Sequence, residues 1–188
     1  MQKAYIYDAI RTPRGKAKAS GGLHDLTPFE LLAPLYHALE ERTGLNPDTV
    51  ADVVLGCVTQ HGEQAGNIAK SSSGYAGWPG HIGGLTVNRF CSSGLDAVNI
   101  AAMKVATGQD QAVVAGGVEM MSRVPMLSDG AAIFTDPELA ARCGVLMMGS
   151  GADLIASLYG VSREQADAVA LASQRKADTA RGNGRFTS

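Results

Sequence analysis

The stretch that decides the fold is LTVNRFCSSGLDAVNIAAMKVATGQDQAVVAGGVE, residues 85–119. Its pattern predicts a short strand over 85–88, a helix over about 92–107 and a second strand over 111–119. Apolar side chains lie around most of the circumference of the helix, which predicts burial on nearly all sides. A strand, a helix and a strand at this short spacing suit a right-handed crossover between parallel strands. The sequence therefore indicates the α/β class.

Two further strands are predicted on the N-terminal side of this unit. Residues 3–10, KAYIYDAI, carry β-type side chains and indicate the first strand. Residues 50–58, VADVVLGCV, are almost continuously apolar, which is typical of a strand covered on both faces. A weak helix of small residues is predicted over 63–76. Together these segments predict a layered fold with a mixed, mostly parallel sheet.

A helix with complete local signals is predicted to begin at Thr27. Thr27 and Glu30 have the spacing of a capping box, in which each side chain bonds the other residue's backbone N–H. Gly44 is a typical stop signal. Pro34 lies inside the helix and predicts a mild kink or a late start.

The composition of the sequence changes after Met121. Residues 122–150 are rich in loop-forming residues, and a short helix is predicted over 152–159. A second capping box at Ser162 opens a helix that runs to about Arg181. We expect a first domain over 1–121 and the start of a loop domain over 122–188.

The composition excludes several classes of protein. The 188 residues carry a formal net charge of −2 and are 45% hydrophobic but only 5% aromatic. A net charge near zero argues against nucleic-acid partners, which require a basic surface. No apolar run approaches the ~18 residues that span a bilayer, and the charged first residues do not form a signal peptide. We therefore expect a cytoplasmic protein without a membrane partner.

Cys91 is the strongest catalytic candidate. The three cysteines, Cys57, Cys91 and Cys143, are odd in number and lack metal-ligand spacing, so neither disulfides nor a metal site is predicted. Cys91 falls between a strand and the start of a helix, where unpaired N–H groups and the helix dipole stabilise a thiolate, the nucleophilic form. Backbone N–H groups there can also bind an oxyanion. A buried structural cysteine is the alternative.

The residues around Cys91 resemble a known family. The stretch NRFCSSGLDAVNIAA, residues 88–102, is similar to the nucleophile segment of thiolases. Four other stretches resemble thiolase segments in the right order: DAIRTPRGK, VVLGCVTQHGEQAGNIAK, AGGVEMMSRVP and MGSGADLIASLYGVSREQADAVALASQRKADTARGNGRF. The resemblance covers nearly the whole chain.

The resemblance implies a thiolase-like layered α-β-α fold, of which this chain is the N-terminal half. Thiolases cleave 3-ketoacyl-CoA with coenzyme A, or condense two acetyl-CoA molecules. By the same resemblance, Cys91 is the nucleophile that becomes a thioester, and its N–H contributes to an oxyanion hole. Coenzyme A and acyl-CoA are the implied substrates, with no permanently bound cofactor and no metal. The whole enzyme is expected to be a homo-oligomer.

The chain departs from the family pattern in two ways. Gly151 and Asp153 stand where threonine and glutamate are usual, and Met147 replaces a histidine of several acetoacetyl-CoA thiolases, which leans toward a longer-chain or atypical substrate. Thiolases also have a second half, which carries the activating histidine, a second cysteine and an oxyanion-hole asparagine. We therefore expect this chain alone to be inactive and to associate through an exposed helix face, as a shortened form, a proteolytic product or a subunit of a split thiolase.

Two alternatives remain open from the sequence. One is a non-catalytic thiolase-like half that binds acyl-CoA or lipid or serves in assembly; the other is a condensing enzyme of the ketoacyl-synthase type. Structural roles are predicted for Cys57, Cys143 and Glu119, the last as a hydrogen-bonded carboxylate. The four histidines match no catalytic segment of the family: His24, His37, His61 and His81.

Overall fold

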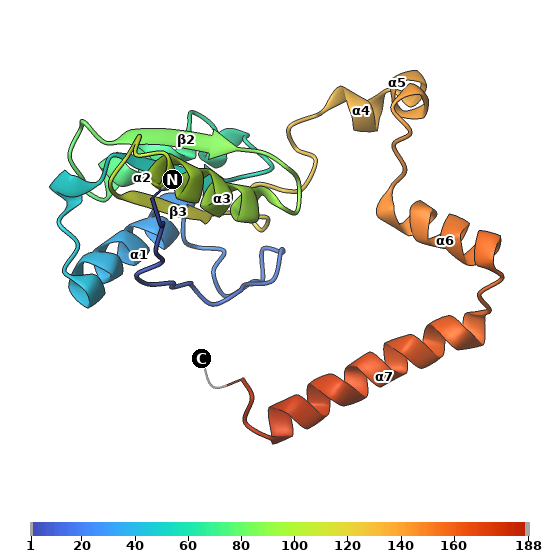
Figure 1. Ribbon diagram of the computed structural model, residues 1–188. Coiled ribbons are helices and arrows are strands. Elements are labelled where there is room, and N and C mark those ends of the chain that lie inside the picture. Colours follow the sequence, from blue (N-terminus) through green and yellow to red (C-terminus); the bar gives the residue numbers. More distant parts are fainter. Residues whose placement is uncertain (1, 187–188) are drawn as a thin grey trace. The chain divides into compact units, whose positions relative to one another are not determined.

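The computed structural model describes residues 2–186 (Figure 1). The chain divides into two compact units, Met1–Ala131 and Ala132–Ser188. The first contains the sheet and the second contains helices only, and each is described by itself below.

The first unit is built on a parallel three-stranded sheet. Its strands are β1 (Asp52–Gly56), β2 (Gly83–Val87) and β3 (Val113–Gly117), in the order β2-β1-β3. These are three of the four predicted strands, and β1 occupies the centre because it is the most continuously apolar. The α/β prediction is confirmed.

The predicted strand over 3–10 is wrong. These residues run outside the sheet, with Tyr5, Ile6 and Tyr7 exposed by 68%, 80% and 89%. Strand-like side chains do not make a strand unless the backbone pairs with a neighbour, and here neither sheet edge, β2 or β3, pairs with this segment.

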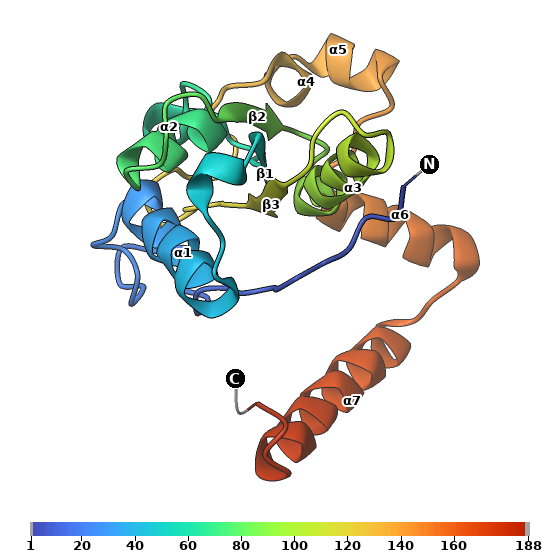
Figure 2. The ribbon, with the colours of Figure 1, turned by 60° about the vertical axis from the view of Figure 1, so that its left-hand side comes forward.

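Helices cover both faces of the sheet. Helix α2 (Ile68–Tyr75) connects β1 to β2, and α3 (Ser93–Ala106) connects β2 to β3. The connection from β1 to β2 and the connection from β2 to β3 run in opposite directions along the sheet. Right-handed crossovers therefore place the two helices on opposite faces. Figures 1 and 2 show α3 on one face, with α2 and α1 (Pro28–Thr43) on the other.

The main core lies between the sheet and the layer formed by α1 and α2. Val53 and Leu55 belong to it from alternate positions of β1, as the two-residue period of a strand requires, and Cys57, directly after the strand, belongs to it too. They pack against helix and loop residues that are also buried: Leu32, Tyr36, Val50, Ile68, Ala69, Trp78 and Ile82.

The capping prediction for α1 is confirmed. The Thr27 hydroxyl accepts a hydrogen bond from the Glu30 N–H at 3.2 Å, and the Glu30 carboxylate accepts one from the Thr27 N–H at 2.7 Å. Gly44 ends the helix at φ 69°, a conformation that glycine adopts without steric cost. The helix begins at Pro28 and runs through Pro34, so the late start is excluded.

Helix α3 is buried on one face only. Ser93, Ala97 and Ala101 are buried against the sheet, whereas Leu95 and Met103 are exposed by 64% and 58%. The prediction of all-round burial is therefore wrong for this chain, because a single sheet packs against the helix. The apolar outer face agrees with the expectation that the chain alone exposes this helix.

The second unit consists of short helices followed by a long one. They are α4 (Ala132–Thr135), α5 (Pro137–Arg142), α6 (Met148–Tyr159) and α7 (Arg163–Gly182). The predicted capping box is present at Ser162, and Gly160 ends α6 at φ 64°. None of residues 132–186 is buried.

Two single-turn 3₁₀ helices, Pro47–Thr49 and Gly62–Gln64, complete the secondary structure. Within residues 2–186, no helix is both long and apolar enough to cross a bilayer.

Candidate active site

The candidate site lies at the carboxyl ends of the three parallel strands. β1 leads into Cys57–Thr59, β2 into Asn88–Cys91, and β3 into Val118–Met120. Parallel strands bring their carboxyl ends to the same edge of a sheet, which is where open α/β folds place ligand and catalytic groups. The structure therefore gathers the three segments that follow the strands.

Cys91 lies in a tight turn between β2 and α3. It is exposed and carries a free thiol. It precedes Ser92, the N-cap of α3, so it lies beside the positive end of the helix dipole, as the sequence predicts. The buried structural alternative is wrong for Cys91, because its side chain is open to solvent.

The backbone of this turn is unusual at Phe90. Its φ is 47°, in the left-handed region that bulky side chains rarely adopt. The Asn88 Oδ1 accepts a hydrogen bond from the Phe90 N–H at 2.8 Å, and the Ser93 hydroxyl donates one to the Phe90 carbonyl at 2.6 Å. The Ser93 oxygen also accepts from the Arg89 N–H at 2.8 Å. Hydrogen bonds on both sides of Phe90 therefore hold the turn that presents Cys91.

Gly56 allows the first turn of α3 to approach the sheet. A Cβ at this position would lie 2.3 Å from the Ser93 carbonyl carbon and 2.4 Å from the Gly94 nitrogen. Real Cβ atoms do not approach backbone so closely, so any side chain here would displace the helix start. The glycine at the end of β1 thus lets the first turn of α3, which follows Cys91, lie directly against the strand.

Glu119 is a structural carboxylate, as predicted. It accepts hydrogen bonds from the Val58 N–H at 2.8 Å, the Thr59 N–H at 3.3 Å and the Gln64 side chain at 2.8 Å. These bonds tie the end of β3 to the loop after β1. The carboxylate is occupied by donors from its own chain, which is the arrangement of a scaffold group.

Gln64 is a further residue of the site, which the sequence does not predict. Its side chain is fully buried, donates to the Thr59 carbonyl at 2.8 Å and accepts from the Met120 N–H at 2.5 Å. A buried amide needs partners for both ends, and here it links the loops after β1 and β3. A lone glutamine in a glycine-rich loop gives no sequence signal for such a role.

The other two cysteines differ from Cys91. Burial, followed by the nearby Glu119 carboxylate, raises the pKa of Cys57 to about 12. Cys57 belongs to the core, as predicted, and Cys143 carries an exposed free thiol. The chain thus holds one buried and two exposed thiols. Cys91 directly precedes the N-cap of α3, whereas Cys143 lies at the C-terminal end of α5.

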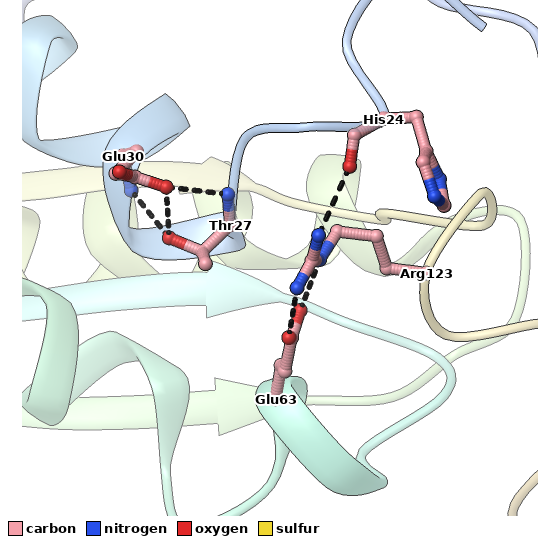
Figure 3. Close-up of polar contacts among 5 residues, drawn as sticks. All are labelled: His24, Thr27, Glu30, Glu63 and Arg123. Atoms are coloured by element: carbon pink, nitrogen blue, oxygen red, sulfur yellow. Dashed lines mark hydrogen bonds and ion pairs between the residues drawn. The ribbon is translucent and has the colours of Figure 1, made fainter. Parts of the chain in front are cut away.

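An ion pair fixes the segment that leaves β3 (Figure 3). Arg123 binds both carboxylate oxygens of Glu63 at 2.7 and 2.5 Å and donates to the His24 carbonyl at 3.1 Å. The Arg123 guanidinium holds the pKa of Glu63 below its ordinary value. This pair connects three loops, those before α1, after β1 and after β3.

No histidine is hydrogen-bonded to the nucleophile candidate. Across residues 2–186, no hydrogen bond or ion pair joins the Cys91 side chain to another group. His37 bonds the Ala76 carbonyl at 3.0 Å, and the His24 backbone holds Arg123. The base that a cysteine nucleophile requires is therefore not supplied by these contacts.

Cys91 belongs to no metal-binding cluster of the described residues and does not line the hollow beside α1. Within the described part of the chain, no three His, Cys, Asp or Glu side chains are grouped to hold a metal ion. A hollow of about 330 Å³ lies between the 11–17 loop, α1 and residues 117–122, and Cys91 is not among its lining residues.

Comparisons with known proteins identify the family of the chain. Residues 4–188 match the family described as "Thiolase, N-terminal domain". The chain is 41% identical to a 3-ketoacyl-CoA thiolase of Shewanella frigidimarina and to one of Shewanella denitrificans, over 99% of this chain and 48% of each relative. It thus spans about half the length of the curated relatives it matches.

A solved structure supports the same fold. The crystal structure of the Bacillus anthracis acetyl-CoA acetyltransferase superposes with a TM-score of 0.69 at 34% identity, covering 89% of this chain and 45% of that one. The fold predicted from the family resemblance is confirmed, and the match favours thiolase over the ketoacyl-synthase-type alternative. The free cysteine at the start of α3, the parallel sheet beneath it and these matches together show that the chain belongs to the thiolase family, in its N-terminal domain.

Proposed function

We propose that this chain forms the nucleophile-bearing part of a thiolase-type acyltransferase. The observation that carries the proposal is the exposed free thiol of Cys91 at the N-terminus of α3, in a turn held by Asn88 and Ser93. A thiolate at a helix N-terminus is stabilised by the unpaired N–H groups and the dipole of the helix.

The proposed reaction has two acyl transfers. The Cys91 thiolate attacks the 3-keto carbon of a 3-ketoacyl-CoA, and the bond between carbons 2 and 3 breaks. The electron pair of that bond takes a proton to give acetyl-CoA, while the acyl group remains on sulfur as a thioester. The thiolate of coenzyme A then attacks the thioester, releases the shortened acyl-CoA and restores the Cys91 thiolate. The reverse sequence condenses two acetyl-CoA molecules.

The groups that move protons in this scheme belong to other parts of the enzyme. No contact in residues 2–186 provides Cys91 with a base, and the chain spans about half the length of its relatives. We therefore propose that a C-terminal thiolase half completes the site and covers the apolar outer face of α3. In this proposal residues 1–121 form the nucleophile domain and 122–188 begin a loop domain.

The assembly and the compartment are part of the same proposal. The complete enzyme is a homo-oligomer that takes acyl-CoA and coenzyme A as substrates and holds no permanent cofactor. It works in the cytoplasm, where a reducing environment keeps a nucleophilic thiol free. Gel filtration of the complete enzyme and cell fractionation test these two statements.

The chemical proposal is tested by competitive labelling of the three thiols. Iodoacetamide at neutral pH, read by peptide mass spectrometry, should modify Cys91 faster than Cys143 and leave Cys57 unmodified. Incubation with acetyl-CoA and the C-terminal half should leave an acetyl group on Cys91, and Cys91→Ser should abolish it. Equal labelling of Cys91 and Cys143 without acetyl transfer would favour the non-catalytic half.

A further inference from the structure

The turn before Cys91 holds a conformation that its own residues do not favour. Phe90 lies at φ 47°, although it is a bulky aromatic residue and not a glycine. Such outliers persist where the surrounding contacts determine them, and they cluster at functional sites. The contacts that hold Phe90 therefore decide where the next residue, Cys91, is placed.

Asn88 contacts both the turn and the neighbouring strand. Its Oδ1 accepts from the Phe90 N–H at 2.8 Å, and its Nδ2 donates to the Val58 carbonyl at 3.2 Å. An asparagine that accepts from the backbone two residues ahead stabilises a turn locally. The bond to Val58 adds a second anchor, beyond the carboxyl end of β1.

The anchor at Val58 is itself held in place. The Val58 N–H donates to Glu119 at 2.8 Å, and Glu119 also accepts from the buried side chain of Gln64 at 2.8 Å. The Val58 carbonyl thus accepts a hydrogen bond from Asn88, and the Val58 N–H donates one to Glu119. A continuous path of hydrogen bonds runs from the end of β3, across the loop after β1, to the turn after β2.

We propose that Asn88 is a positioning residue for Cys91. It acts through the Phe90 peptide and the Val58 carbonyl, without touching the substrate, and it holds the thiol at the N-terminus of α3. The inference rests on the proposed function, because it matters only if Cys91 is the nucleophile. Glu119 supports Asn88 by fixing Val58, which gives this structural carboxylate a part in the site.

The test measures the reactivity of the thiols in the whole chain. Iodoacetamide labelling reports Cys91, with exposed Cys143 as the reference and buried Cys57 as the indicator of folding. Asn88→Ala removes both hydrogen bonds and should lower the ratio of Cys91 to Cys143 labelling about fivefold, at the lower end of what two hydrogen bonds contribute. Asn88→Ser offers a hydroxyl to the Phe90 N–H but cannot reach Val58, so its ratio should fall about twofold, between alanine and wild type.

The control is Asn99→Ala, which removes an exposed asparagine of α3 and should leave the ratio unchanged. A merely structural role for Asn88 would expose Cys57 and would not give the graded order of asparagine, serine and alanine. If alanine exposes Cys57, the serine variant decides: a reduced ratio with Cys57 protected supports the proposal, and a wild-type ratio refutes it.

Failure of this inference is distinct from failure of the proposed function. A wild-type Cys91 that labels no faster than Cys143 contradicts the nucleophile assignment itself. A reactive wild-type Cys91 whose ratio is unchanged in Asn88→Ala, or equally reduced in the alanine and serine variants, overturns only the positioning role.

Discussion

The two units of this chain form helices by the same local rules but differ in packing. α1 and α7 both begin with a complete capping box, at Thr27 and Ser162. In the first unit Leu55 is only 2% exposed, whereas in the second Leu154 is 47% exposed. Capping residues determine where a helix begins, but burial requires another layer of structure. The second unit contains the local signals without such a layer.

The strongest test of this difference removes one leucine from each unit. Leu55→Ala should lower the free energy of unfolding by about 3 kcal/mol, because it leaves a cavity in the core. Leu154→Ala should change it by less than about 0.5 kcal/mol, since its side chain is half open to solvent. Urea unfolding followed by the fluorescence of the only tryptophan, buried Trp78, reports the first unit. Similar losses from both variants would mean that α6 is packed in solution.

A glycine comparison tests how closely the first unit is packed. Gly56→Ala should destabilise it by about 2–3 kcal/mol, because the new Cβ meets the backbone of Ser93 and Gly94. Gly74→Ala, in α2, meets no atom within 4 Å and should stabilise the helix by about 0.5–1 kcal/mol. The same unfolding experiment measures both. A harmless Gly56→Ala would argue against the close contact of β1 and α3.

The two capping boxes should respond differently to the same substitution. Thr27→Ala should lower the free energy of unfolding of the first unit by about 1 kcal/mol, because α1 is packed into the core. Ser162→Ala should fray the first turn of α7 and leave the Trp78 transition unchanged. Amide hydrogen exchange over residues 163–166 detects the fraying. A shift of the Trp78 transition by Ser162→Ala would show that the units unfold together.

The smallest expected effect concerns the ion pair of Glu63 and Arg123. Arg123 lowers the pKa of Glu63. The ionised carboxylate therefore stabilises the folded protein at pH values above the ordinary carboxyl range. This stabilisation is lost as the pH falls through the lowered pKa. Glu63→Gln should cost less than about 1 kcal/mol at neutral pH, since the pair is partly exposed. Its difference from wild type should vanish in acid.

Unfolding midpoints from neutral pH to below pH ~4, the ordinary carboxyl range, measure this dependence. The matched control is Glu41→Gln, on the exposed side of α1, which should leave the pH dependence of the wild type unchanged. A Glu63→Gln difference that persists in acid would show that the side chain acts through packing and not through its charge.

Much of the fold could be predicted because its signals are local. Capping boxes, terminal glycines and the apolar run of β1 act over a few residues, so the bounds of α1, α7 and β1 came close to the observed ones. Cys91 could be recognised because a strand, a cysteine and a helix follow one another directly. The strand over 3–10 failed because pairing is a property of two segments, which one segment cannot reveal.

The parts of the site that could not be predicted depend on contacts between distant residues. The residues around Gln64 do not predict its role. Its side chain accepts a hydrogen bond from the Met120 N–H, 56 residues away, and so joins the loops after β1 and β3. The strained turn at Phe90 is held locally by Asn88 and Ser93, but its tie to the loop after β1 is the hydrogen bond from Asn88 to the Val58 carbonyl, 30 residues away.

The sequence by itself determined the α/β class, the ends of most helices and the choice of Cys91, because these follow from local propensity, capping and order along the chain. Only the tertiary structure decided which face of α3 is buried, and it alone brought the segments after β1, β2 and β3 to one edge. Hydrogen bonds such as those of Asn88, Gln64 and Glu119 exist only after the sheet has aligned those ends. Packing and strand pairing each require two or more segments that are distant along the chain. They are therefore properties of the assembled layers and cannot be read from any one segment of the sequence.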